Sequence, residues 1–303
     1  MAADTYAPRR PARSRHRVLR GLRHHLLEWG DASLATPARP SLVMVHGWMD
    51  VAASFQFVVD ALPDDRHVIA LDWRGFGDTD APQPSEAYWF PDYVADLDAL
   101  LAAECPDRPI DLLGHSMGGN VVMLYAGIRP QAVRRLVNLE GFGMPATKPA
   151  MAPRRWRQWL DELREPARLR GYDSLDGVAE RLRQTNPLLP ADKARWLAAQ
   201  WSRREGDAYV LRADPAHKRT SPLLYQVDEV LEVWKCIEAP LLWVDGDRTD
   251  IARWWGDRYP RSEFDERLAV VKNVRPVRLS PAGHMLHHDQ PEALAAALRD
   301  FLA

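Results

Sequence analysis

The sequence predicts an α/β fold, in which a mostly parallel sheet is interrupted by a helical segment. Over the first 143 residues, short apolar runs alternate with helical patterns, which is typical of βαβ units. From residue 145 to residue 235 the strand patterns stop, and Trp- and Arg-rich segments with helical spacing replace them. Strand patterns then return before a final amphipathic helix. We therefore expect one α/β core, residues 1–144 and 236–303, with an insert at 145–235.

Six short runs have the length and composition of strands buried in a parallel sheet. They are Leu42–His46, His67–Asp72, Ile110–His115, Arg135–Glu140, Pro240–Val244 and Val274–Leu279. The segment from His24 to Gly30 alternates weakly between apolar and polar residues, which suggests an antiparallel strand on the edge of the same sheet. The chain closes with a helix whose apolar stripe contains Leu294 and Leu298.

The residue pattern of the insert at 145–235 predicts helices and no strands. Trp156, Trp159, Leu160 and Leu163 fall at positions i, i+3, i+4 and i+7, which places them on one face of a helix. Prolines recur through this segment and cut it into short pieces, since proline ends or kinks a helix. We expect an all-helical cap on a single core.

The charge distribution limits the kinds of partner. The 303 residues include 40 basic and 42 acidic side chains, so the protein as a whole lacks the positive charge that favours nucleic acids. Hydrophobic residues make up 46% and charged residues 27%, values typical of a globular protein rather than a disordered one. Seven arginines and one acid lie within residues 1–25, and we expect residues 1–16 to form a flexible basic arm.

The sequence shows neither a secretory signal nor a membrane span. Its longest uncharged apolar run, around Val121 to Ile128, is far shorter than the ~20 residues that cross a bilayer. Cys105 and Cys236 are too few for a disulfide framework, and neither lies in a metal-ligand pattern. We expect a cytoplasmic protein with no nucleic-acid partner, no cofactor and no metal. The oligomeric state does not follow from the sequence.

Gly114-His115-Ser116-Met117-Gly118 has the Gly-x-Ser-x-Gly pattern of a nucleophile elbow. It follows an apolar run that predicts a strand and opens a helical pattern that begins near Val121, which is the context this motif requires. The glycines permit a turn that a β-carbon would obstruct, and the turn presents the serine hydroxyl at the carboxyl edge of the sheet. Ser116 is therefore the candidate nucleophile.

Four motifs, in this order along nearly the whole chain, resemble those of the α/β-hydrolase superfamily. They are His46-Gly47-Trp48, the run from Asp72 to Asp80, the run from Gly114 to Gly119, and Gly283-His284-Met285. His46 to Asp50, followed by Ser54 and Phe55, most resembles the serine-hydrolase-like branch. The resemblance implies an eight-stranded sheet flanked by helices, with a helical cap inserted after the sixth strand. The glycines after Asp72 lack the Lys-Ser/Thr ending of a phosphate loop, so we interpret this run as a structural turn.

Attack on a carbonyl group builds negative charge on its oxygen, which backbone N–H groups can stabilise. One predicted donor is the amide of Met117, which follows the nucleophile at a helix N-terminus, where N–H groups are free. By resemblance, the second donor of this oxyanion hole is the amide of Trp48.

The general base should be a histidine on a late loop. His284 follows the last strand pattern and stands directly after Gly283, as the family pattern implies. His287 and His288 are rivals that we interpret as loop or packing residues. Their spacing gives no recognisable metal-ligand set. His46 and His115 are likewise interpreted as structural.

The third member of the triad should be a carboxylate between Ser116 and His284 in chain order. The family usually places it three or four residues after a glycine that ends a strand, which favours Asp250, with Asp247 next. A minority of the family places it at the end of the sixth strand, where this chain has Glu140.

These residues predict a serine hydrolase that cleaves small carboxylic esters through an acyl-enzyme intermediate. C–C bond, lactone and amide hydrolases and perhydrolases share the same triad, and a non-catalytic binding protein of this fold is a further alternative. Most of the tryptophans in and after the insert should be packing residues. Four of them are candidates for the wall of a substrate pocket, namely Trp156, Trp159, Trp254 and Trp255.

Overall fold

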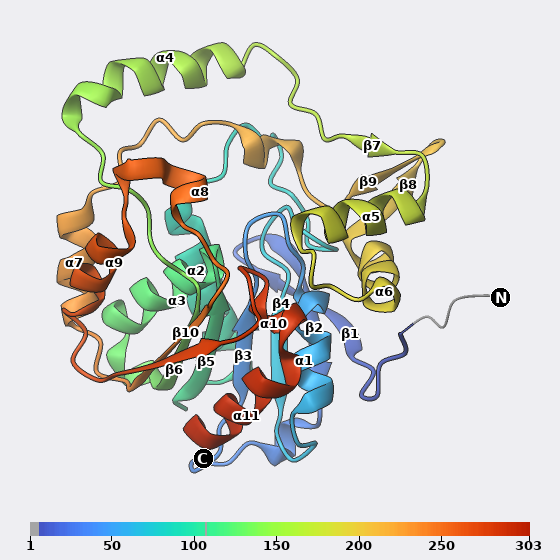
Figure 1. Ribbon diagram of the computed structural model, residues 1–303, viewed down its shortest axis with the longest axis vertical. Helices are drawn as coiled ribbons and strands as arrows, with labels where there is room; N and C mark the ends of the chain where they lie inside the picture. The colour runs from blue at the N-terminus through green and yellow to red at the C-terminus, as the bar shows by residue number, and fades with distance from the viewer. Residues whose placement is uncertain (1–5, 107) are drawn as a thin grey trace.

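The structure, a computed structural model that describes residues 6–106 and 108–303, is built on an eight-stranded sheet (Figure 1). The strands are β1 (Arg13–Leu19), β2 (Leu22–Trp29), β3 (Leu42–Val45), β4 (Val68–Leu71), β5 (Ile110–His115), β6 (Val133–Leu139), β10 (Leu241–Gly246) and β11 (Val274–Leu279). Their order is β1-β2-β4-β3-β5-β6-β10-β11. β2 runs antiparallel to β1 and β4, and the other neighbouring pairs are parallel. This confirms the predicted eight-stranded, mostly parallel sheet.

Helices cover both faces of this sheet. One face packs on α2 (Phe90–Glu104), α3 (Met117–Ile128), α7 (Val227–Lys235) and α9 (Arg261–Leu268), and the other on α1 (Gln56–Ala61), α10 (Leu286–Asp289) and α11 (Pro291–Phe301). Within β3, Val43 and Val45 face the first set, while Leu42 and Met44 face the second. Both faces of the strand are buried, which explains why the parallel strands read as continuous apolar runs. None of the helices in the described part of the chain combines the length and the hydrophobicity that a membrane crossing requires.

The six predicted parallel strands each overlap an observed one, and their ends differ by no more than two residues. The weakly alternating segment at 24–30 is β2, which runs antiparallel as expected. It is not the edge strand, because β1 pairs beyond it from Arg13↔Glu28 to Leu19↔Leu22.

The expectation of a flexible basic arm over residues 1–16 is wrong for the part that the structure describes, residues 6–16. The amides of Arg9 and Arg10 each donate to the carboxylate of Asp60 at 2.9 Å. Farther along, Arg13 and Arg15 donate to Glu28, at 2.5 Å and 2.7 Å. The main chain of residues 9 and 10 and the guanidinium groups of Arg13 and Arg15 are thus bonded to acids of the core. Residues 1–5 lie outside the described residues.

The insert is not all-helical. It contains α4 (Ala152–Glu162), α5 (Leu175–Thr185) and α6 (Ala191–Trp201), but also an antiparallel sheet of β7 (Gly171–Tyr172), β8 (Ser202–Glu205) and β9 (Ala208–Leu211). The turn between β8 and β9 contains Gly206 at φ +59°, a conformation that glycine adopts without strain. Because β8 exposes three consecutive charged residues, it gives no apolar strand signal.

α7 forms the end of the predicted insert. α7 packs on α3, closely enough that a β-carbon at Gly127 would collide with the main chain of Val233. α7 therefore packs with the helices that flank the main sheet, although it lies within the predicted insert. In Figure 1, α4 lies at the top of the view, apart from the helices that flank the sheet.

Candidate active site

Ser116 occupies a strained turn between β5 and α3. Its φ of 51° lies in the left-handed region, which a residue with a side chain adopts only when its surroundings enforce it. A β-carbon at Gly114 would collide with the carbonyl oxygen of Gly118, and one at Gly118 would collide with the main chain of Val45. The two glycines of the motif are therefore required by close packing of the main chain, as expected for a nucleophile elbow.

Ser116 forms a hydrogen-bonded chain with His284 and Glu140. The Oγ of Ser116 lies 2.9 Å from Nε2 of His284, and Nδ1 of His284 lies 2.7 Å from Oε2 of Glu140. The other carboxylate oxygen of Glu140 accepts the N–H of Gly246 at 2.7 Å. This geometry is that of a nucleophile, a base and the group that orients the base.

Asp250, the preferred acid from the sequence, does not contact His284. Its side chain is exposed and accepts the N–H of Ala252 at 3.0 Å, at the start of α8 (Ala252–Trp255). The second choice, Asp247, accepts the hydroxyl of Ser280 and the N–H of Ala282 instead. The prediction of Asp250 is therefore wrong, because its side chain does not contact His284. Glu140 occupies the position expected of the carboxylate that orients the imidazole.

Glu140 reaches His284 because it directly follows β6 in an unusual conformation. Its φ is 54°, and its N–H donates to the carbonyl oxygen of Val244 on β10 at 3.1 Å. Its side chain, only 1% exposed, turns toward the loop that carries His284. An acid immediately after a buried strand and before Gly141 is the sequence signal for this position.

Desolvation acts on both His284 and Glu140. Burial raises the pKa of Glu140, against the opposing hydrogen bond from the N–H of Gly246, and burial lowers the pKa of His284. A neutral imidazole has a lone pair at one ring nitrogen. With Nδ1–H directed at Glu140, that lone pair is at Nε2 and faces the hydroxyl of Ser116.

The loop after β3 lies directly beside the elbow. A β-carbon at Gly47 would come 3.1 Å from Cβ of Ser116, so only glycine fits there without displacing the nucleophile. His46 fixes this loop: its Nδ1 donates to the carbonyl of Gly47 at 2.7 Å, and its Nε2 accepts the N–H of Trp73 at 3.0 Å. His46 thus has the structural contacts expected of it.

Trp48 and Met117 directly follow Gly47 and Ser116, two residues that lie side by side. Met117 is the first residue of α3, where N–H groups have no partner within the helix. Among the hydrogen bonds of the described residues, neither amide donates to a protein acceptor. Both are therefore available to an oxygen bound beside Ser116.

Of the four candidate pocket tryptophans, Trp254 contacts the triad. Its ring lies 4.5 Å from the ring of His284 in an edge-to-face arrangement, and 41% of its surface is exposed. Trp255 packs on Trp254 and on Tyr259. Trp156 and Trp159 lie on α4 and pack on each other. The contacts therefore associate Trp254, rather than the α4 pair, with the reacting groups.

The glycine-rich run after β4 is held by its own charged side chains. Asp72 accepts His25 Nδ1 at 2.6 Å and the N–H of Ala52 at 2.7 Å. Arg74 forms two hydrogen bonds of 2.6 Å with Asp96. These contacts fit the predicted structural turn.

Comparison with known proteins assigns the family. The sequence profile described as alpha/beta hydrolase fold matches residues 40–291, so the chain belongs to the α/β-hydrolase fold family. It is similar to the serine hydrolase-like protein of Danio rerio, at 27% identity over 285 residues, covering 90% of this chain and 83% of that protein. This confirms the resemblance to the serine-hydrolase-like branch.

Two further similarities extend over most of the chain. The 3-hydroxybutyrate-oligomer hydrolase of Cupriavidus necator is 28% identical over 294 residues, covering 90% of this chain and 91% of that protein. Among solved structures, the thioesterase domain from the curacin biosynthetic pathway superposes with a TM-score of 0.81 at 23% identity. That superposition covers 95% of this chain and 99% of the thioesterase domain, and it supports the fold.

Proposed function

We propose that this protein is a serine hydrolase that cleaves carboxylic esters of small molecules through an acyl-enzyme intermediate. The observation that carries the proposal is the continuous hydrogen-bonded chain from Ser116 through His284 to Glu140. Such a chain lets a weakly acidic hydroxyl act as a nucleophile at neutral pH.

In the first half of the reaction, Oγ of Ser116 attacks the ester carbonyl carbon while Nε2 of His284 takes the hydroxyl proton. Glu140 stabilises the imidazolium that forms and keeps its ring oriented. When the tetrahedral intermediate collapses, His284 gives the proton to the departing alkoxide and the acyl group stays on Ser116. Water, activated by the same imidazole, then releases the acid.

The amides of Trp48 and Met117 would hold the oxyanion in both halves of the reaction. Each such donor typically contributes about 2.7–4 kcal/mol to stabilisation of the transition state. Gly47 supports this role, because its lack of a side chain lets the loop approach Ser116.

Two similarities favour an ester as the substrate. The relative from Cupriavidus necator is named for 3-hydroxybutyrate oligomers, whose units are joined by carboxylic ester bonds, and the curacin domain is a thioesterase. Each of these names describes the transfer of an acyl group to water. Trp254 supplies an apolar edge beside His284 against which an acyl or alcohol group would pack. The two free cysteines fit a cytoplasmic setting for this activity.

A panel of p-nitrophenyl esters of increasing acyl length tests the proposal. We expect turnover of at least the short esters, a burst of p-nitrophenol from acylation, and loss of both in Ser116→Ala. Retained labelling of Ser116 by a fluorophosphonate without turnover of any ester would instead indicate a C–C, lactone or amide hydrolase. A folded protein that neither reacts with the fluorophosphonate nor turns over esters would be a binding protein.

A further inference from the structure

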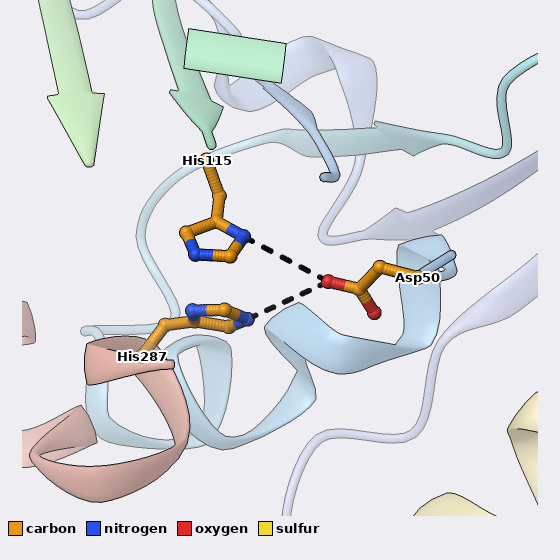
Figure 2. A group of neighbouring side chains, drawn as sticks. All are labelled: Asp50, His115 and His287. Carbon is orange, nitrogen blue, oxygen red and sulfur yellow. Dashed lines mark ion pairs between the residues drawn. The ribbon is translucent and has the colours of Figure 1, made fainter. Parts of the chain in front are cut away.

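A second group of polar side chains lies near the nucleophile, around His115, which directly precedes Ser116 and whose ring lies 4.8 Å from that of His284. Asp50 comes from the loop after β3, His115 ends β5, and His287 lies on α10 (Figure 2). The three residues are 2%, 1% and 0% exposed. The triad does not use their side chains.

The tautomer of His115 is fixed by its partner. Its Nε2 lies 2.8 Å from the main-chain carbonyl oxygen of His284, which can only accept, so Nε2 carries the proton. Nδ1 of His115 therefore presents a lone pair, and this lone pair faces Oδ2 of Asp50 at 3.9 Å.

Asp50 also presents an unshared acceptor. Its Oδ1 accepts the N–H of Val51 at 2.7 Å and the hydroxyl of Ser54. Its Oδ2 has no hydrogen-bond partner among the described residues, although it is buried. Figure 2 shows that His115 Nδ1 and His287 Nε2 both point at this oxygen, each at 3.9 Å.

His287 completes the group. Neither of its ring nitrogens has a hydrogen-bond partner in the described part of the chain, and the ring is fully buried. Leaving buried polar atoms unpaired costs about 1–3 kcal/mol each, so a group of them pointing at one place indicates a site built for an occupant.

We propose that Asp50, His115 and His287 bind a divalent transition-metal ion such as Zn²⁺. The three ligand atoms lie within 4.8 Å of one another. Zn²⁺ at about 2.0–2.1 Å from each of two ligands in a tetrahedral site separates them by about 3.4 Å. The two Asp50–His pairs, at 3.9 Å, must therefore close by about 0.5 Å, and the two imidazole nitrogens by up to about 1.4 Å, for all three to reach the ion. Two imidazoles and one carboxylate are donors that suit this class of ion. This proposal departs from the expectation of no metal, which rested on local ligand spacing, whereas these three ligands are far apart along the chain.

The partner of His115 supports the assignment to a metal. Histidines that bind metal ions usually donate their other ring N–H to a carboxylate or a backbone carbonyl, which fixes the ring and its tautomer. His115 makes this contact with the carbonyl of His284. An ion at Nδ1 would therefore be linked mechanically to the loop of the general base. The binding site itself is separate from the ester hydrolysis proposed above.

The test uses untagged, chelator-treated protein titrated with ZnCl₂ by calorimetry, and with CoCl₂ by visible absorption. We expect one Zn²⁺ per chain with Kd below about 1 µM, a rise in Tm, and the strong visible bands of four-coordinate Co²⁺. Asp50→Asn keeps Oδ1 for Val51 and Ser54 but replaces Oδ2 with an amide nitrogen. This variant and His287→Asn should each weaken Zn²⁺ binding by at least about 100-fold.

His288→Asn is the matched control, because His288 is the neighbouring buried histidine and lies outside the group. We expect it to retain one Zn²⁺ per chain. If the variants do not fold, X-ray absorption spectroscopy of the Zn²⁺-loaded wild type gives the number of imidazole ligands. Two imidazoles support the proposal, and any other number contradicts it. The proposal is overturned by Zn²⁺ binding that survives in folded Asp50→Asn, or by folded wild type that binds no Zn²⁺.

Discussion

Nδ1 of His284 lies 2.7 Å from Oε2 of Glu140, a residue that follows β6 and not β10. The carboxylate that contacts His284 thus follows a different strand from the one that the sequence favoured. Glu140 is buried while Asp250 is exposed, so the two acids differ in surroundings as well as in distance from the imidazole. Substitutions of Glu140 and of Asp250 should therefore have different effects on activity.

Glu140→Gln should lower kcat far more than Asp250→Asn. Glutamine does not stabilise the imidazolium and accepts the Nδ1–H less strongly, so we expect a loss of about 10²–10⁴-fold in kcat. Asp250→Asn should stay within about twofold of wild type, because the exposed Asp250 side chain accepts the N–H of Ala252 and does not contact His284. Steady-state hydrolysis of p-nitrophenyl acetate measures both. A larger loss in Asp250→Asn, with Glu140→Gln near wild type, would reverse our assignment.

Gly47→Ala should impair catalysis without unfolding the protein. The added methyl group would lie 3.0 Å from His115 Nδ1 and 3.1 Å from Ser116 Cβ, so the loop must shift by a few tenths of an ångström. We expect a fall of about 10–100-fold in kcat, since oxyanion stabilisation depends on donor position. The matched control is Gly177→Ala in α5, where the new methyl group meets only an ordinary contact of 3.5 Å. If Gly47→Ala and Gly177→Ala are equally active, the loop after β3 has no part in catalysis.

Trp254→Ala should affect substrate binding more than chemistry. Its exposed ring packs edge-on against His284, so removing it enlarges the site without removing a reacting group. We expect a several-fold rise in KM for longer acyl chains with a smaller change in kcat. Trp156→Ala, on α4, should change KM less. The p-nitrophenyl esters of increasing acyl length give both kcat and KM. A larger rise in KM in Trp156→Ala than in Trp254→Ala would place the substrate pocket beside α4.

The ion pairs between Glu28 and the arginines of β1 should weaken at acid pH. Burial opposes ionisation of Glu28, but hydrogen bonds from Arg15, His67 and Arg13 outweigh it and hold its pKa at about 2. An unfolded glutamate has a pKa of about 4.3, so this contribution is complete above that pH and is lost as the pH falls toward about 2.

Urea unfolding of wild type and Glu28→Gln at several pH values measures this contribution. Wild type should be more stable by about 1–3 kcal/mol at pH 7, and the difference should narrow below about pH 4.5. A difference that stays constant down to the lowest pH at which both variants fold would mean that Glu28 ionises normally in the folded state.

Much of the core could be predicted because buried parallel strands and a nucleophile elbow leave local signals. The apolar run at 110–115 and the glycines around Ser116 suffice to predict a strand, a sharp turn and a helix. His284 was identified by its place after Gly283. These features depend on residues adjacent in sequence, so periodicity and motif spacing reveal them.

The acid and the edges of the fold depend on contacts between distant residues. Glu140 meets His284 across 144 positions, and nothing near Asp250 indicates that its side chain would turn toward Ala252. β1 reads as a basic arm because its arginines are neutralised by Glu28 and Glu104, which sequence order does not connect to them. Within the insert, β7 has only two residues and β8 exposes three charged residues, so neither shows the apolar pattern of a strand.

The central claim is that Ser116 is a nucleophile activated by His284 and Glu140. It is tested most directly by reacting the intact protein with a fluorophosphonate and locating the adduct by peptide mass spectrometry. We predict one adduct per chain, on Ser116, with none in Ser116→Ala and much slower labelling in His284→Ala and Glu140→Gln. Labelling of wild type at another residue, or no labelling of the folded protein, would contradict the account.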